Sequence, residues 1–213
     1  MRKYEYIIWD WNGTLFNDVP VCIKTMNTIL AKRNMPEITK DHYLSIFDFP
    51  VRNYYVKLGF DFSVEPFEKI SEEFIALYKT EFRKAPLFDD TVDILERFEK
   101  SGLSQLIISA SHNNDLEDQV GHFGINHFFS NLLGLDTIHA SGKVEIGTRW
   151  ARESGLEKEK MIVIGDTVHD YKVAQSIGCD CILVANGHQN RERLECAGVP
   201  VINALTELTG IML

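Results

Sequence analysis

The chain has 213 residues, 45% of them hydrophobic and 25% charged, which is ordinary usage for a folded protein and excludes a largely disordered one. Its 31 acidic and 22 basic residues give a formal net charge of −9, which argues against a protein that neutralises nucleic-acid phosphates or lies on anionic lipid. Because the chain starts without an apolar leader and has no apolar run long enough to span a bilayer, we expect a cytoplasmic protein with no nucleic-acid or membrane partner.

The first predicted element is a short strand that ends at a carboxylate. Residues 6–9 are Tyr-Ile-Ile-Trp, and Asp10 follows them directly, before Gly13 and Thr14. Such a strand places Asp10 at the carboxyl edge of a sheet, where open α/β sheets bind ligands, and Gly13 allows a tight turn around the ligand. Two interpretations remain open: Asp10 is a nucleophile or metal ligand, or it caps a turn in which Thr14 bonds the backbone.

Residues 17–84 show helical periodicity without a strand pattern, which predicts a helical insert. Apolar residues at helical spacing predict one helix that ends near Asn34 and a second that runs from Phe67 toward Phe82. The aromatic-rich stretch between them, residues 47–55, includes Arg52. It either packs inside the insert or forms a lip in which Arg52 contacts the substrate.

After residue 85, short apolar runs alternate with helical patterns. The strands are expected at 106–108, within 128–135, at 161–164 and at 181–184. The helices are expected around 94–98, 115–123, 146–154 and 171–177. Such alternation produces a parallel sheet covered by helices on both faces. We therefore expect a doubly wound, Rossmann-like α/β core from residues 1–16 and 85–213, with an all-helical cap inserted at 17–84.

Four predicted strand ends bring polar groups to one edge of this sheet. Asp10 follows the first strand, Ser109 the second, Lys143 the third, and residues 165–170, Gly-Asp-Thr-Val-His-Asp, the fourth. Together they offer an oxygen nucleophile, oxygen ligands for Mg²⁺, a cation and a hydroxyl, which is the set that a phosphoryl group requires. Each residue alone also fits a structural role in a turn or a helix cap, so the prediction depends on their order after successive strands.

These motifs resemble those of the haloacid dehalogenase superfamily, specifically its phosphatases with a helical cap, similar to phosphoglycolate phosphatases. The matching segments are residues 10–15 (DWNGTL), residues 107–111 (IISAS), Lys143 and residues 165–170 (GDTVHD). The first and last of them are specific, the other two are weak alone, and the resemblance covers nearly the whole chain.

The resemblance implies a Mg²⁺-dependent phosphatase that acts on a small phosphorylated metabolite, as a monomer or a homodimer. Asp10 would attack phosphorus to form an aspartyl phosphate. The predicted catalytic residues are Asp10, Asn12, Ser109 and Lys143. The predicted phosphate- and substrate-binding residues are Gly13, Thr14, Ser109, Ala110, Lys143 and Arg52. The predicted metal ligands are Asp10, Asn12 through its main-chain carbonyl, Asp166, and Asp170 directly or through water.

Asn12 departs from the family pattern, in which a second aspartate protonates the leaving oxygen and then activates water. An amide cannot transfer that proton, and general acid–base catalysis is worth about 10²- to 10⁴-fold. Three explanations remain open: His112 or Asp18 supplies the proton; the substrate has a good leaving group, as an acyl phosphate has; or the protein binds phosphorylated ligands in a regulatory role with little turnover.

Two further alternatives concern other segments. A phosphonate hydrolase, which we rank lower, needs a cap lysine to form a Schiff base, and the candidates are Lys24, Lys32 and Lys57. The loop at residues 185–190 follows the last predicted strand and is either a polar connection or a border of the site.

Overall fold

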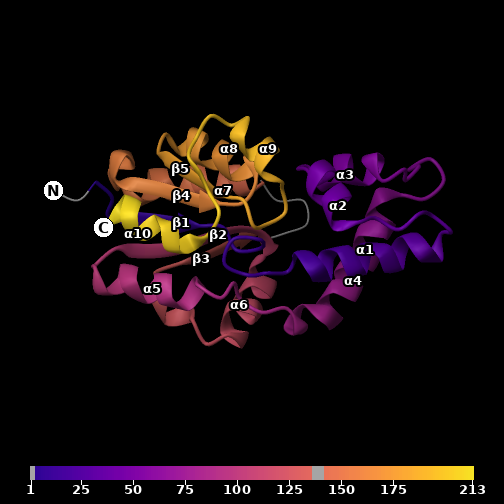
Figure 1. Cartoon of the computed structure of the whole chain (residues 1–213), viewed down its shortest axis with the longest axis horizontal. Coiled ribbons are helices and arrows are strands. Elements are labelled where there is room, and N and C mark those ends of the chain that lie inside the picture. Colours follow the sequence, from indigo (N-terminus) through magenta and orange to yellow (C-terminus); the bar gives the residue numbers. More distant parts are fainter. Residues whose placement is uncertain (1–2, 136–141) are drawn as a thin grey trace.

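The computed structural model describes residues 3–135 and 142–213 and shows an α/β core beside a group of helices (Figure 1). The core contains a six-stranded parallel sheet in the order β3-β2-β1-β4-β5-β6. The strands are β1 (Tyr6–Trp9), β2 (Ser104–His112), β3 (Leu132–Leu135), β4 (Met161–Gly165), β5 (Asp180–Val184) and β6 (Val201–Ile202). The predicted doubly wound α/β fold is confirmed.

Helices cover both faces of the sheet because successive residues of a strand point to opposite sides. Trp9 of β1 packs in a buried cluster with residues of α5, α6 and α10, whereas the adjacent Ile8 packs with residues of α7, α8 and α9. The core helices are α5 (Thr91–Lys100), α6 (Asn113–His122), α7 (Lys143–Ser154), α8 (Val168–Ile177), α9 (Arg191–Glu195) and α10 (Leu208–Met212). Short 3₁₀ turns lie at Phe82–Lys84, Asn126–Phe128, Lys158–Lys160 and Leu205–Glu207.

The helices between β1 and α5 form a separate packing unit at one end of the sheet, which we call the insert (Figure 1). It consists of α1 (Val19–Lys32), α2 (Lys40–Ile46), α3 (Val51–Lys57) and α4 (Phe67–Glu81). Met26, Tyr43 and Ile70 lie in its own hydrophobic cluster and are almost fully buried. The insert therefore has a core of its own, which supports it independently of the sheet.

The two connections between the insert and the core lie side by side. The Asn17 backbone N–H donates to the Pro86 carbonyl at 3.0 Å, and the Phe88 N–H donates to the Leu15 carbonyl at 3.1 Å. An antiparallel bridge joins Phe16 to the second connection. The chain thus leaves and re-enters the core at one place, a few residues after Asp10.

The structure extends the predicted elements in several places. β2 continues through Ser109 to His112, so these polar residues lie on the strand and not after it. Helix α7 begins at Lys143, three residues earlier than expected. Helices α2 and α3 and strand β6 have no counterpart among the predicted elements. Among the helices of the described residues, none combines the length and the apolar character needed to cross a bilayer.

Candidate active site

Asp10 lies at the carboxyl edge of the central strand, where the sequence pattern places it. Its backbone N–H donates to the Ile164 carbonyl of the neighbouring strand at 2.8 Å, which fixes the residue at the end of the sheet. Gly13 then adopts φ +77°, a conformation that favours glycine, and its N–H donates to the Phe16 carbonyl at 2.8 Å. The resulting tight turn holds the Asp10 side chain, which is only 8% exposed.

Three carboxylates converge beside this turn. Oxygen atoms of Asp10, Asp166 and Asp170 all lie within 4.8 Å of one another, and all three side chains are buried. The Thr14 hydroxyl lies between two of them, 3.2 Å from an Asp10 oxygen and 3.1 Å from an Asp166 oxygen. The Asp170 carboxylate accepts hydrogen bonds from the backbone and hydroxyl of Thr167 at 3.0 and 2.7 Å, which fixes it in the first turn of α8.

Lys143 places a cation in the middle of the cluster. It is the first residue of α7, it is buried, and its ammonium group contacts both Asp10 and Asp170. Burial alone would lower the pKa of Lys143, but the two carboxylates raise it above its usual value, so the side chain remains charged. Burial likewise pushes the pKa of Asp170 upward, but Lys143 and Thr167 hold it below its usual value.

The donor set fits a hard divalent cation. All three side-chain donors are carboxylates, and oxygen-only sites suit Mg²⁺ better than zinc. Burial, followed by the charge of the neighbouring carboxylates, raises the pKa of both Asp10 and Asp166, and a bound cation would relieve that crowding. Gly13 and Gly187 make room at the same point, because a Cβ on either residue would overlap the Asp166 carboxylate.

Ser109 and Ala110 lie on the adjacent strand β2 and line the same cavity as Asp10. The Ser109 hydroxyl is buried and accepts a hydrogen bond from the Ser111 backbone N–H at 3.0 Å. Lys143, the third predicted motif, lies at the start of α7 and also lines this cavity. The structure thus brings the nucleophile candidate, the hydroxyl, the cation and the carboxylates together.

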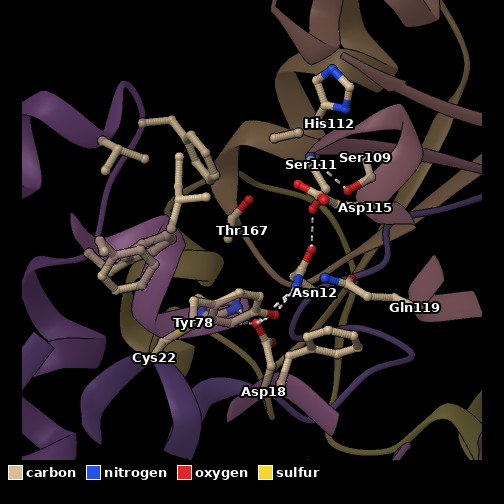
Figure 2. Close-up of a pocket in the computed structure, with 18 of the residues that line it drawn as sticks. Asn12, Asp18, Cys22, Tyr78, Ser109, Ser111, His112, Asp115, Gln119 and Thr167 are labelled. Atoms are coloured by element: carbon tan, nitrogen blue, oxygen red, sulfur yellow. Dashed lines mark hydrogen bonds and ion pairs between the residues drawn. The ribbon is translucent and has the colours of Figure 1, made fainter. Parts of the chain in front are cut away.

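The Asn12 side chain is held from both sides (Figure 2). Its carbonyl oxygen accepts from the Ser111 hydroxyl at 2.8 Å. Its amide donates to the Asp18 carboxylate at 2.8 Å and to the Tyr78 hydroxyl at 3.0 Å, and Tyr78 in turn donates to Asp18 at 2.8 Å. Asn12 is therefore oriented by one residue of the core and two of the insert, and its amide faces a carboxylate.

Asp18 also forms a buried ion pair with His188, at 3.2 Å between Oδ1 and Nε2. The other ring nitrogen of His188 lies 2.7 Å from the Tyr43 hydroxyl. Burial favours the neutral imidazole, but Asp18 outweighs it and raises the pKa of His188 to about 9. Burial also opposes ionisation of Asp18, yet His188 and the Tyr78 and Asn12 hydrogen bonds lower its pKa. The pair joins the insert to the loop after β5.

The sequence identifies only some of the residues around this ion pair. Asp18 was a candidate proton donor, and the loop at residues 185–190 was a possible border of the site. The structure shows that the loop does border it, because the His188 backbone N–H donates to Asp166. Tyr78 and Tyr43 had no sequence signal beyond helical packing.

Of the remaining candidate residues, some line the cavity and others do not. The guanidinium of Arg52 stacks over Phe62 at 4.3 Å, and Arg52 is not part of the wall of the cavity. His112 does line the cavity, and its ring accepts from the Asn114 backbone N–H at 3.3 Å as the cap of α6. The insert lysines proposed for Schiff-base chemistry each pair with a carboxylate, and none is among the residues described as lining the cavity; they are Lys24, Lys32 and Lys57.

A cavity of about 850 Å³ connects the carboxylates to the insert. Its floor includes Asp10, Ser109 and Lys143, and helices of the insert form the opposite wall. Figure 2 shows Tyr78 and Cys22 on the insert side and Ser111 and His112 on the core side. The cavity therefore lies between the core and the insert, with the carboxylates on its core side.

Carboxylates at the carboxyl edge of a doubly wound parallel sheet are typical of α/β enzymes that bind their ligand outside the ends of the strands. The family model of the haloacid dehalogenase-like hydrolases matches residues 7–184. The chain belongs to this family, which confirms the predicted resemblance to the haloacid dehalogenase-like hydrolases.

The chain is similar over most of its length to characterised relatives. It is 20% identical over 211 residues to a phosphoglycolate phosphatase of Aliivibrio fischeri, covering 93% of this chain and 92% of that protein. A phosphoglycolate phosphatase of Vibrio cholerae is 21% identical over 213 residues, covering 96% and 91%. The similarity therefore extends over nearly the full length of both relatives.

Solved structures confirm the fold. A haloacid dehalogenase-like hydrolase from Streptococcus pneumoniae superposes with a TM-score of 0.84 at 19% identity, covering 99% of both chains. A protein from Haemophilus somnus described as a predicted phosphoglycolate phosphatase superposes with a TM-score of 0.79 at 18% identity, covering 100% of both chains. The helical insert is therefore part of a shared architecture.

Proposed function

We propose that the protein is a Mg²⁺-dependent phosphatase that cleaves a small phosphomonoester through an aspartyl phosphate on Asp10. The observation that carries this proposal is the convergence of Asp10, Asp166 and Asp170 around a buried lysine at the carboxyl edge of β1 and β4. We also propose that residues 17–84 act as the cap that closes this site.

Each residue has a defined task in this reaction. An Asp10 oxygen attacks phosphorus, the bond from phosphorus to the ester oxygen breaks, and the leaving oxygen takes up a proton. Water then attacks the same phosphorus, releases inorganic phosphate and restores the Asp10 carboxylate. Lys143 and the Ser109 hydroxyl hold phosphoryl oxygens, whose negative charge the ammonium group balances. The Thr14 hydroxyl keeps Asp10 and Asp166 at a fixed spacing.

The carboxylates of Asp10, Asp166 and Asp170 and the main-chain carbonyl of Asn12 would hold Mg²⁺. When bound, the cation supplies charge neutralisation for the phosphoryl oxygens. The donor set and the glycine-lined space beside Asp166 support this assignment.

The missing acid at Asn12 limits the choice of leaving group. The Asn12 side chain is held by Ser111, Asp18 and Tyr78, so it positions its neighbours but transfers no proton. We therefore expect slow turnover of simple alkyl phosphates and faster turnover of esters and acyl phosphates whose leaving oxygen needs no proton.

Phosphate release from acetyl phosphate, 4-nitrophenyl phosphate and ethyl phosphate, with and without Mg²⁺, tests the proposal. We expect Mg²⁺-dependent release that Asp10→Asn abolishes. Asn12→Asp should raise turnover of ethyl phosphate by about 10²-fold or more. The new carboxyl would lie against Asp18, so the double variant Asn12→Asp with Asp18→Asn is the matched control that removes this repulsion. Metal-independent release, or full activity of Asp10→Asn, would refute the proposal.

The Asn12 amide also supports a second candidate function, a phosphate-binding or regulatory protein with little turnover. Such a protein would bind inorganic phosphate with Mg²⁺ and gain thermal stability from both, but would release no phosphate from any of these compounds. The phosphonate hydrolase gains no support from the insert lysines, because the described lysines of the insert include none in the cavity wall except Lys79, which is paired with Asp115.

A further inference from the structure

The wall that the insert contributes to the cavity is predominantly aromatic. Tyr43, Phe47 and Tyr54 line it and form one connected group, with ring centroids 5.2 to 5.6 Å apart. The group continues across to the core, because the Phe47 ring lies 4.9 Å from the His188 ring. On the far side, Phe74 of α4 and Tyr78 stack at 6.0 Å and line the same space. Tyr43 and Tyr54 are buried behind this surface, whereas the half-buried rings of Phe47, Phe74 and Tyr78 present apolar surface to a ligand in the cavity.

The cations of this cavity are already neutralised. Among the described lining residues, each lysine and arginine contacts a carboxylate: Lys143 contacts Asp10 and Asp170, Lys79 lies 2.7 Å from Asp115, and Arg83 lies 3.0 Å from Asp118. Lys143 serves the transferred phosphoryl group, and Lys79 and Arg83 are solvent-exposed side chains paired with α6, so neither is a buried cation beside Phe47 and Phe74. A second anionic group on the substrate would therefore be buried without a free cation, which is strongly unfavourable.

The histidines of the cavity wall do not add a free positive charge. His188 is paired with Asp18, inside the same network. The His169 ring stacks on Phe49 at 4.7 Å between ring centroids, and the His112 ring accepts the Asn114 backbone N–H at the start of α6.

From this wall we infer the substrate class: a phosphomonoester of an aromatic or similarly bulky apolar alcohol that carries no second anionic group. The inference rests on the proposed phosphatase function and narrows it. It separates this chain from its relatives called phosphoglycolate phosphatases, because phosphoglycolate is small and carries a carboxylate next to the phosphate.

Steady-state kinetics with 2-phenylethyl phosphate, ethyl phosphate and phosphoglycolate test the inference. All three release a primary alkoxide, so differences in kcat/KM report chiefly on contacts with the cavity wall. We expect kcat/KM for 2-phenylethyl phosphate to exceed both other values by about 10- to 100-fold, mainly through KM. Equal values, or a preference for phosphoglycolate, would overturn the inference.

A lysine introduced into the cavity wall tests whether the lack of a free cation there disfavours a second anionic group. Ile75 of α4 lines the cavity and is 42% exposed, so Ile75→Lys adds an unpaired cation without disturbing the core. We expect this change to shrink the preference for 2-phenylethyl phosphate over phosphoglycolate by about tenfold. Val64→Lys adds the same charge at an 81% exposed position of the insert outside the cavity wall and should leave the preference as it is. An equal effect of both variants would overturn the inference.

The activity on 4-nitrophenyl phosphate shows whether the phosphatase function or only the substrate class is wrong. Its leaving group needs no proton, so it is cleaved by any working site of this kind. Absence of Mg²⁺-dependent release from it and from acetyl phosphate would refute the phosphatase function itself. Release from both, combined with no preference for 2-phenylethyl phosphate, would refute only the substrate class.

Discussion

The ion pair between Asp18 and His188 makes the stability of the protein depend on pH, and Asp18→Asn should remove this dependence. Asparagine keeps the shape of the side chain and can still accept from Asn12 and Tyr78, so the substitution removes chiefly the charge. Without Asp18, burial is opposed only by the smaller effects of Asp166 and Asp10, so the pKa of His188 falls.

The magnitude follows from the pKa of His188, which Asp18 and the neighbouring carboxylates raise from 6.5 to about 9 despite burial. A difference of about 2.5 in pKa, at about 1.36 kcal/mol per pKa unit, corresponds to about 3 kcal/mol. Because the folded state binds the proton more tightly, this stabilisation is fully present below about pH 6.5 and is lost as the pH rises through about 9. The lowered pKa of Asp18 reflects the same interaction, so its free energy is not added to that of His188.

Urea unfolding at about pH 6 and about pH 9.5, with EDTA present, measures the effect. The free energy of unfolding of the wild type should fall by about 3 kcal/mol more than that of Asp18→Asn over this interval. Asp180→Asn is the matched control, because Asp180 pairs with an exposed lysine, Lys3, whose pKa lies above this interval. Parallel losses in the wild type and Asp18→Asn would refute the reasoning.

Three further changes probe the site and the core. Lys143→Met leaves Asp10 and its neighbours without their buried cation, so unfolding in EDTA should become easier by about 3–5 kcal/mol, with part of the loss restored by Mg²⁺; a neutral effect would contradict the charge balance described here. Gly13→Ala should lower the melting temperature and remove its response to Mg²⁺, because the new Cβ overlaps Asp166, whereas Gly124→Ala, at a similar φ of +68° but facing open space, should cost only about 1–2 kcal/mol; equal effects would exclude a steric cause. Phe98→Ala empties a fully buried site stacked against a tryptophan of β1 and should cost about 3–5 kcal/mol by urea unfolding, and a loss below about 1 kcal/mol would mean that the surrounding core collapses around it.

The sequence was most informative where an apolar run ends in a polar residue. The runs before Asp10 and Asp166 are buried strands, and both carboxylates lie at the predicted edge, because a parallel strand buried on both faces has an almost continuous apolar sequence. The same reasoning placed the end of β2 too early. Ser109 and the polar residues after it remain in the strand because this end of β2 borders the cavity, where polar side chains need not be buried in the core.

The missed features depend on contacts between distant segments. Asn12 and Tyr78 are 66 residues apart, and His188 reaches Asp166 across 22 residues, so no local pattern marks these pairs. Helices α2 and α3 have only seven residues each, too few to show a helical period among so many aromatic residues. Strand β6 has two residues and pairs with β5 without any run of its own. Arg52 carried a charge that fitted the expected ligand, but its place in α3 directs it to Phe62.

The adjacent connections at Asn17 and Pro86 make the insert a modular unit. The chain leaves and re-enters the core through two neighbouring segments that are hydrogen-bonded to each other. These backbone contacts can form whatever sequence lies between the two segments. The helices of the insert can therefore be lengthened or exchanged, or their side chains substituted, without altering the register of β1 or the position of Asp10. Selectivity can therefore change through one contiguous stretch of sequence, provided that the contacts of Asp18 and Tyr78 with Asn12 are kept.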